Sequence, residues 1–117
     1  MDTETSQRVC EIIAGLLFVD GDFHTEEAKF FSRLLARFGL PSDTKVDHIE
    51  DAAAAIARLR ELGAGERTET LALLIEAAVA DGVVHPAERI LIGAVGEELG
   101  VSEEVIDARL KLALAKS

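Results

Sequence analysis

Two stretches of this chain, sixty-one residues apart, carry the same set of side chains able to bind a cation. Both follow the pattern Asp-Gly-x-apolar-His-x-x-Glu, in which x is any residue. Their carboxylates and imidazoles belong to Asp20, His24 and Glu27 in the first copy and to Asp81, His85 and Glu88 in the second. Carboxylate oxygens combined with imidazole nitrogens suit zinc or manganese better than calcium. The pattern therefore predicts that one or both copies bind such a divalent metal.

The same residues also have a purely structural interpretation as helix caps. Proline is favoured at the first position of a helix, so Pro86 makes His85 the N-cap and places Glu88 at the third helical position. From there a glutamate can accept a hydrogen bond from the backbone N–H of the cap residue. Glu27 stands in the same relation to His24. Capping and metal binding both remain open at this level.

The spacing of apolar residues predicts an all-α fold. Val9, Ile12, Ile13 and Leu16 recur at the three-and-four spacing of one helix face, and no segment shows the sustained alternation typical of a strand. The last two helices are expected to turn Ile90 and Val105 inward with their other apolar residues. Helices are expected at about 5–19, 25–38, 52–62, 66–80, 86–99 and 102–114, and residues 45–51 form either a further short helix or the approach to the next one.

The repeat also predicts how the chain is organised. Its 117 residues fit a single domain, an irregular helical bundle of related halves at about 5–43 and 66–107. Gly39 and Gly100 end equivalent helices in these halves. The break at 63–65 is too short to be a domain linker.

Composition narrows the classes of partner. With 22 acidic and 12 basic residues the net charge is -10, which disfavours nucleic acid and anionic membranes and favours cations and basic protein partners. Cys10 is the single cysteine, so no disulfide can form within the chain. The start of the sequence is acidic where a signal peptide would be basic, and the apolar runs are too short to span a bilayer. We therefore expect a cytoplasmic protein.

Several of these features together resemble the tellurite-resistance TerB-like domain, over about residues 9–114. They are the two Asp-Gly turns, the alanine-rich approach at 77–82 and the later Leu-Gly-Val-Ser at 99–102. The resemblance implies a compact all-α domain of about seven helices in two related halves. It also implies a role in tellurite and stress-response systems, and a related module lies at the front of a membrane-anchored J-domain co-chaperone.

The family's acidic positions have been proposed as a metal site, with no established enzymatic activity. Carried over to this chain, they are Asp20, Glu27, Asp81 and Glu88. The chain departs from the family pattern where serine or threonine commonly precedes the helix, because histidines stand at these two positions.

Two functions from different classes follow. The first is a non-enzymatic module of a bacterial stress response that acts through cation binding, protein contacts, or both. The alternative is a metal-dependent enzyme that uses the Asp, His and Glu ligands, which would need an open coordination position beside a pocket. No catalytic residue and no organic cofactor site are indicated.

Overall fold

The described residues of the chain form helices joined by short connections. The structure, a computed structural model, describes residues 2–17, 25–41, 43, 52–80 and 82–116, without the side chains of 17, 25–27, 52, 55 and 56. Six helices and no strands occur in this part of the chain. They are α1 (Thr3–Leu17), α2 (Thr25–Arg37), α3 (Ala52–Arg60), α4 (Ala64–Val79), α5 (Pro86–Glu98) and α6 (Glu103–Lys116).

The all-α prediction is therefore confirmed, with six helices in place of about seven. The segment 45–51, for which a further short helix was one alternative, lies outside the described residues.

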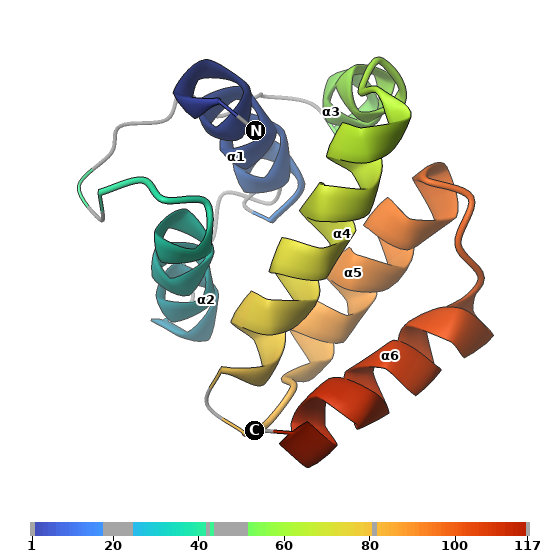
Figure 1. Cartoon of the computed structure of the whole chain (residues 1–117). Helices are drawn as coiled ribbons and strands as arrows, with labels where there is room; N and C mark the ends of the chain where they lie inside the picture. Colours follow the sequence, from blue (N-terminus) through green and yellow to red (C-terminus); the bar gives the residue numbers. More distant parts are fainter. Residues whose placement is uncertain (1, 18–24, 42, 44–51, 81, 117) are drawn as a thin grey trace.

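Helix α4 lies in the middle of the bundle and contacts α2, α5 and α6 (Figure 1). Helix α1 packs mainly on α3 and α2, and α5 also contacts α3 and α6. Apolar side chains from all six helices form one buried cluster, whose fully buried members include Ile12, Phe30, Leu59, Leu74, Ile92 and Ile106. Burial of such side chains is the main favourable term for folding, at about 1.5–3 kcal/mol each.

Helices α2 and α5 end in the same way, as the internal repeat predicts. Leu40 N–H donates to the carbonyl of Leu35, and Val101 N–H donates to the carbonyl of Gly96, at 2.9 and 2.8 Å. Each bond spans a glycine with positive φ, Gly39 at 75° and Gly100 at 81°. This is the Schellman arrangement, in which a left-handed glycine lets the chain turn back over the last helical turn. Both ends are related by the sixty-one-residue offset of the sequence repeat.

Two residues expected to face inward are instead exposed. Ile90 is 72% exposed and Val105 is 47% exposed. On α5 the buried stripe runs through Leu91, Ile92 and Val95, and on α6 through Ile106 and Leu110. Each exposed residue is one position outside its stripe, a rotation of about 100° around the helix.

The contact between α5 and α6 yields a test of core packing at Gly96. A β-carbon at this position would lie 2.6 Å from Cδ1 of Ile106, a side chain with no exposed surface. We expect Gly96→Ala to lower the free energy of unfolding by about 1–3 kcal/mol, the usual cost of overpacking. In an Ile106→Val background, which lacks Cδ1 but keeps a carbon at the position of Cγ1, 3.3 Å away, the same change should cost clearly less, because alanine is about 1 kcal/mol better than glycine in a helix. Urea unfolding of the four proteins measures this coupling.

Gly65 provides the matched control. It lies in the first turn of α4, and a β-carbon there meets no atom within 4 Å. Gly65→Ala should therefore stabilise the protein by up to about 1 kcal/mol. An equal effect of Gly96→Ala in both backgrounds would contradict the close contact with Ile106.

Candidate functional site

The structure describes only part of the two predicted cation-binding sets. Asp20, His24 and Asp81 lie outside the described residues. Glu27 lies in the first turn of α2, but its side chain is not described. His85 and Glu88 are described, so the geometry of the site can be built from the second copy.

His85 is the N-cap of α5, as predicted. Its backbone is extended, with φ -74° and ψ 149°, and Pro86 follows at the first helical position. The half-buried imidazole makes no capping hydrogen bond to the helix. The histidine therefore occupies the cap position without supplying the side-chain acceptor that serine or aspartate would provide there.

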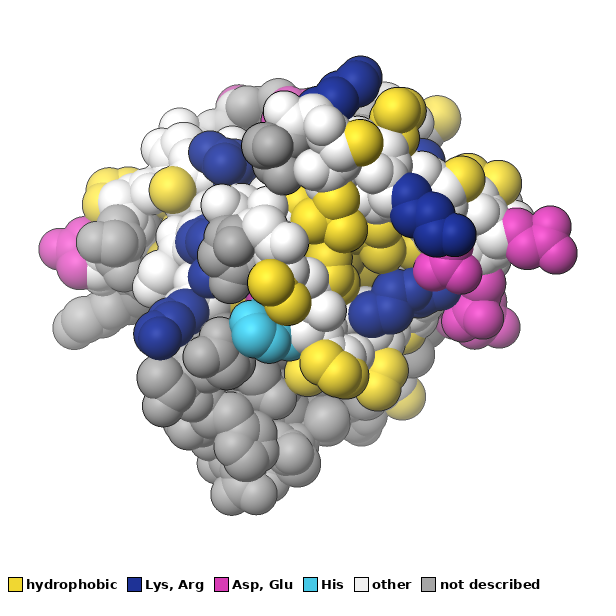
Figure 2. All heavy atoms as spheres, turned by 90° about the horizontal axis from the view of Figure 1, so that it is seen from below, with side chains coloured by type: hydrophobic (Ala, Val, Ile, Leu, Met, Phe, Trp, Pro, Cys, Tyr) yellow, Lys and Arg dark blue, Asp and Glu magenta, His cyan; other side chains and the backbone are white. Residues whose placement is uncertain are grey.

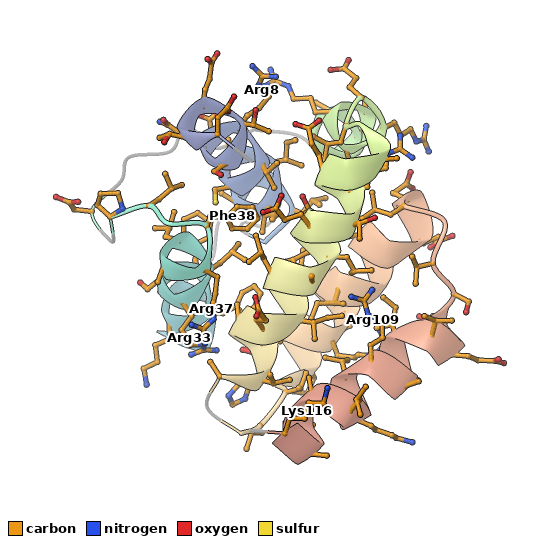
Figure 3. The ribbon with its side chains drawn as sticks, in the orientation of Figure 1. Arg8, Arg33, Arg37, Phe38, Arg109 and Lys116 are labelled. Carbon is orange, nitrogen blue, oxygen red and sulfur yellow. The ribbon has the colours of Figure 1, made fainter. Side chains whose placement is uncertain are left out.

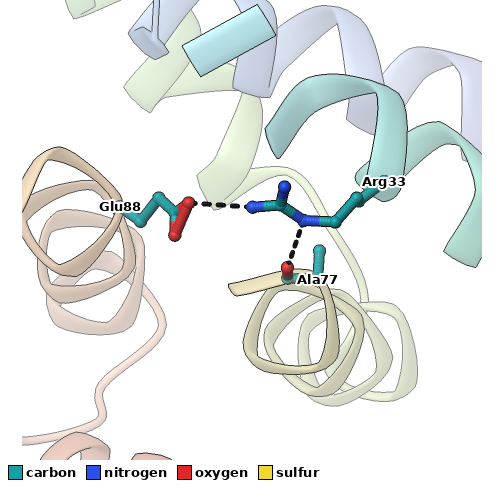
Figure 4. A network of polar contacts seen from close by, with 3 residues as sticks. All are labelled: Arg33, Ala77 and Glu88. Carbon is teal, nitrogen blue, oxygen red and sulfur yellow. Dashed lines mark hydrogen bonds and ion pairs between the residues drawn. The ribbon is translucent and has the colours of Figure 1, made fainter. Parts of the chain in front are cut away.

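Glu88 has a role that the capping interpretation did not predict. Its side chain is 2% exposed, and Oε1 lies 3.0 Å from Nη2 of Arg33, on α2. The Nε of Arg33 donates to the backbone carbonyl of Ala77 on α4, at 2.9 Å (Figure 4). One guanidinium thus joins three helices, and it joins α2 of the first half to α4 and α5 of the second.

The position of Arg33 explains how a charged residue enters this region. It extends from α2 next to the core residues Phe30 and Leu34, with its guanidinium carbon 6.0 Å from the centre of the Phe30 ring. The stem of an arginine can lie along apolar surface while the planar head meets a carboxylate. Its side chain is 22% exposed, so the pair is closed on the Glu88 side and reaches solvent on the Arg33 side.

Arg33 was not among the predicted site residues, although the sequence holds a signal for a buried pair. Glu88 falls on the apolar stripe of α5, three, four and seven residues before Leu91, Ile92 and Val95. A carboxylate on a buried stripe requires a positively charged or hydrogen-bonding partner. The identity of that partner could not be deduced, because Arg33 is 55 residues away in the chain.

The described residues do not gather as metal ligands. No group of three or more His, Cys, Asp or Glu side chains comes together among them. Oε1 of Glu88 is engaged by Arg33, so a cation bound at this oxygen would compete with the buried ion pair. Because Asp81 and the first set lie outside the described part of the chain, metal binding at the two turns stays a prediction.

Cys10 is a core residue in the structure. Its side chain has no exposed surface, and burial raises the pKa of the thiol to about 12. Since the thiolate is the reactive form, this thiol is held in its unreactive state near neutral pH. Cys10 is therefore a structural core residue.

The surface near the C-terminus combines apolar and basic side chains. Figure 2 views this end of the bundle and shows a hollow floored by hydrophobic side chains, with Lys and Arg side chains on both sides of it. No helix among the described residues is long and apolar enough to cross a bilayer. Apolar surface beside charged groups is typical of contact sites for other molecules.

Comparison with known proteins decides the family. The family model described as "Tellurite resistance protein TerB" matches residues 41–110, more than half of the chain. The chain belongs to the TerB family. The matched range contains Asp81, His85 and Glu88, so the described part of the site lies within the TerB domain. The resemblance deduced from the Asp-Gly turns is confirmed.

This TerB-family chain is also similar to part of a curated bacterial protein. It is 50% identical over 42 residues to the co-chaperone protein DjlA of Aliivibrio fischeri (strain ES114). The similar segment makes up 36% of this chain and 15% of the co-chaperone, so most of that protein has no counterpart in the match. No solved structure matches the chain.

The buried ion pair generates a stability prediction for the TerB domain. Arg33→Met leaves the Glu88 carboxylate buried without its cation and should lower the free energy of unfolding by about 3–5 kcal/mol. Adding Glu88→Leu removes the charge that needs a partner, so the double variant should recover most of the loss. Thermal and urea unfolding at pH 7 measure both effects.

Arg60→Met is the matched control. Arg60 Nε lies 2.8 Å from Oε2 of Glu98, but its side chain is 66% exposed, so breaking this pair should change the stability much less than Arg33→Met does. A double variant at Arg33 and Glu88 that is as unstable as the sum of its single variants would contradict the proposed charge coupling.

Proposed function

We propose that this TerB domain is a non-enzymatic module of a bacterial stress response, including resistance to tellurite, and that it works by contacts with other proteins. The family supports the stress-response assignment, since its description names tellurite resistance. The partial similarity to a co-chaperone supports a role in protein contacts, because a co-chaperone works together with another protein.

The observation that carries the non-enzymatic part of the proposal is the use made of Glu88. Among the described residues it is the one buried charged side chain, and its partner is Arg33. A buried carboxylate paired with the arginine that joins three helices serves stability, and a general acid or base must instead reach a substrate proton. The acidic groups that remain for function therefore lie at the surface and at the two turns.

A second mode of action, cation binding, is favoured by a difference between the two halves. The residue sixty-one positions after Arg33 is Ala94, so the sequence has no arginine at the position where an equivalent partner for Glu27 would stand. The acidic set of the first turn thus lacks the neutralising residue that engages Glu88. We assign zinc or manganese binding to Asp20, His24 and Glu27, with Asp22 as a further oxygen donor.

Growth in tellurite tests the main proposal. Deletion of the gene in its natural host should lower the tellurite concentration that stops growth, and a plasmid copy of the wild-type gene should restore tolerance. The Gly65→Ala variant, altered in open space, should restore it equally well. A deletion strain as tolerant as its parent would remove the basis for this function.

Calorimetric titration of zinc and manganese tests the cation assignment. We expect binding to wild type, loss of binding in Asp20→Asn, and retention in the matched Asp81→Asn variant, because the second copy has its glutamate engaged by Arg33. Loss in both variants would show a site shared by the two turns. Absence of binding to wild type would refute the cation assignment and leave the main proposal standing.

A further inference from the structure

A groove of about 280 Å³ runs between α4 and α6. Ile75 of α4 and Leu112 and Ala113 of α6 line it with apolar surface. Leu112 is 58% exposed, and each additional square ångström of apolar surface removed from water contributes about 25 cal/mol. The groove therefore offers a contact surface that would gain from being covered.

Charged side chains border this apolar floor. Arg109 and Lys116 line the groove from α6 and extend on the side of that helix where α4 lies (Figure 3). Glu76 lines it from α4. Two positive charges against one negative charge give the groove a basic balance, in a chain whose net charge is -10.

Among the described residues, Arg109 is the half-buried arginine with no hydrogen bond or ion pair; Arg37 and Arg58 have none either, but they are exposed. Arg8, Arg33, Arg60 and Arg89 each meet a carboxylate, and a further arginine donates to backbone carbonyls. Within the described part of the chain, no hydrogen bond or ion pair engages Arg109, although it is half-buried. The guanidinium still reaches water, and a carboxylate from outside the chain would replace that water with a charge-assisted hydrogen bond.

We propose that the groove between α4 and α6 binds an amphipathic helix of another protein, with its apolar stripe on Leu112 and its carboxylates against Arg109 and Lys116. This inference rests on the proposed function as an interaction module and names the partner's chemistry. Arg109 and Lys116 lie seven residues apart on one helix, a separation of roughly 10 Å, so the matching carboxylates are about two turns apart on the partner. Glu76 favours a basic residue on the partner's other flank.

Net charge argues against the two other occupants of such a groove. A second copy would bring another charge of -10 to the interface, and an anionic membrane would meet the same repulsion. A helix from another protein, in contrast, can place its carboxylates at the basic positions of the groove and nowhere else. Contacts between these carboxylates and the basic side chains of the groove then fix the alignment of the helix, which the net charge of the protein does not fix.

Two designed peptides test this proposal, because the groove and the net charge of the protein predict opposite preferences between them. The first probe is a fluorescent alanine-based helix of about 18 residues with a leucine stripe and two glutamates two turns apart beside it. The second probe has lysines in place of both glutamates. The net charge of the protein alone favours the lysine peptide, whereas the groove favours the glutamate peptide.

Fluorescence anisotropy should show the glutamate peptide binding wild type at least about tenfold more tightly, the effect of one charge-assisted hydrogen bond or more. Arg109→Gln with Lys116→Gln should abolish this preference, and Leu112→Ala should weaken both peptides. Arg37→Gln with Lys111→Gln removes the same charge from exposed positions outside the groove and should leave the preference intact. Circular dichroism confirms that each variant is folded.

Preference for the lysine peptide, or equal loss in the control variant, would overturn the proposal. Light scattering that shows a dimer dispersed by Arg109→Gln with Lys116→Gln would also overturn it, because a second copy would then be the occupant. Growth in tellurite distinguishes failure of the stress-response proposal from failure of the groove proposal. A deletion strain with no phenotype rejects the stress-response function. Full complementation by Arg109→Gln with Lys116→Gln, together with no preference of the wild-type protein between the peptides, rejects the groove proposal alone.

Discussion

One buried ion pair, between Arg33 and Glu88, ties α2 to α5 and leads to a contact with α4. Glu88 is almost fully enclosed, and a carboxylate in that environment is stable only with a cation or hydrogen-bond donors next to it. Arg33 supplies the cation from the other half and also donates to the carbonyl of Ala77. The pair therefore restricts how α2 can lie against α4 and α5, and apolar packing fills the space around it.

This pair also engages the glutamate of the second copy of the sequence motif. The copies share residue types and helix-ending geometry, since α2 and α5 finish in the same hydrogen-bond pattern. They differ in sequence at the position of Arg33, the partner of Glu88, because its counterpart in the repeat is Ala94. The glutamate of the second copy therefore contributes to the stability of the domain through an arginine that the repeat does not duplicate.

The acidic character of the chain and its basic groove act at different ranges. Net charge governs the approach of ions and proteins over about a Debye length, roughly 8–10 Å at physiological salt. Contact selectivity depends instead on single groups such as Arg109, which is half-buried between α4 and α6. The proposed docking of a partner through carboxylates at the groove is therefore compatible with the acidic net charge of the chain.

The sequence by itself determined the helices, their glycine ends, the repeat and the family, because apolar periodicity, left-handed glycines and proline at a helix start act locally. It also placed His85 at a cap. Only the tertiary structure decided that Glu88 pairs with Arg33, that Ile90 and Val105 face outward, and that Arg109 borders a groove. These outcomes depend on helix rotation and on contacts between residues far apart in the chain, and the pairing energy of a buried charge exists only once the helices have excluded water around it.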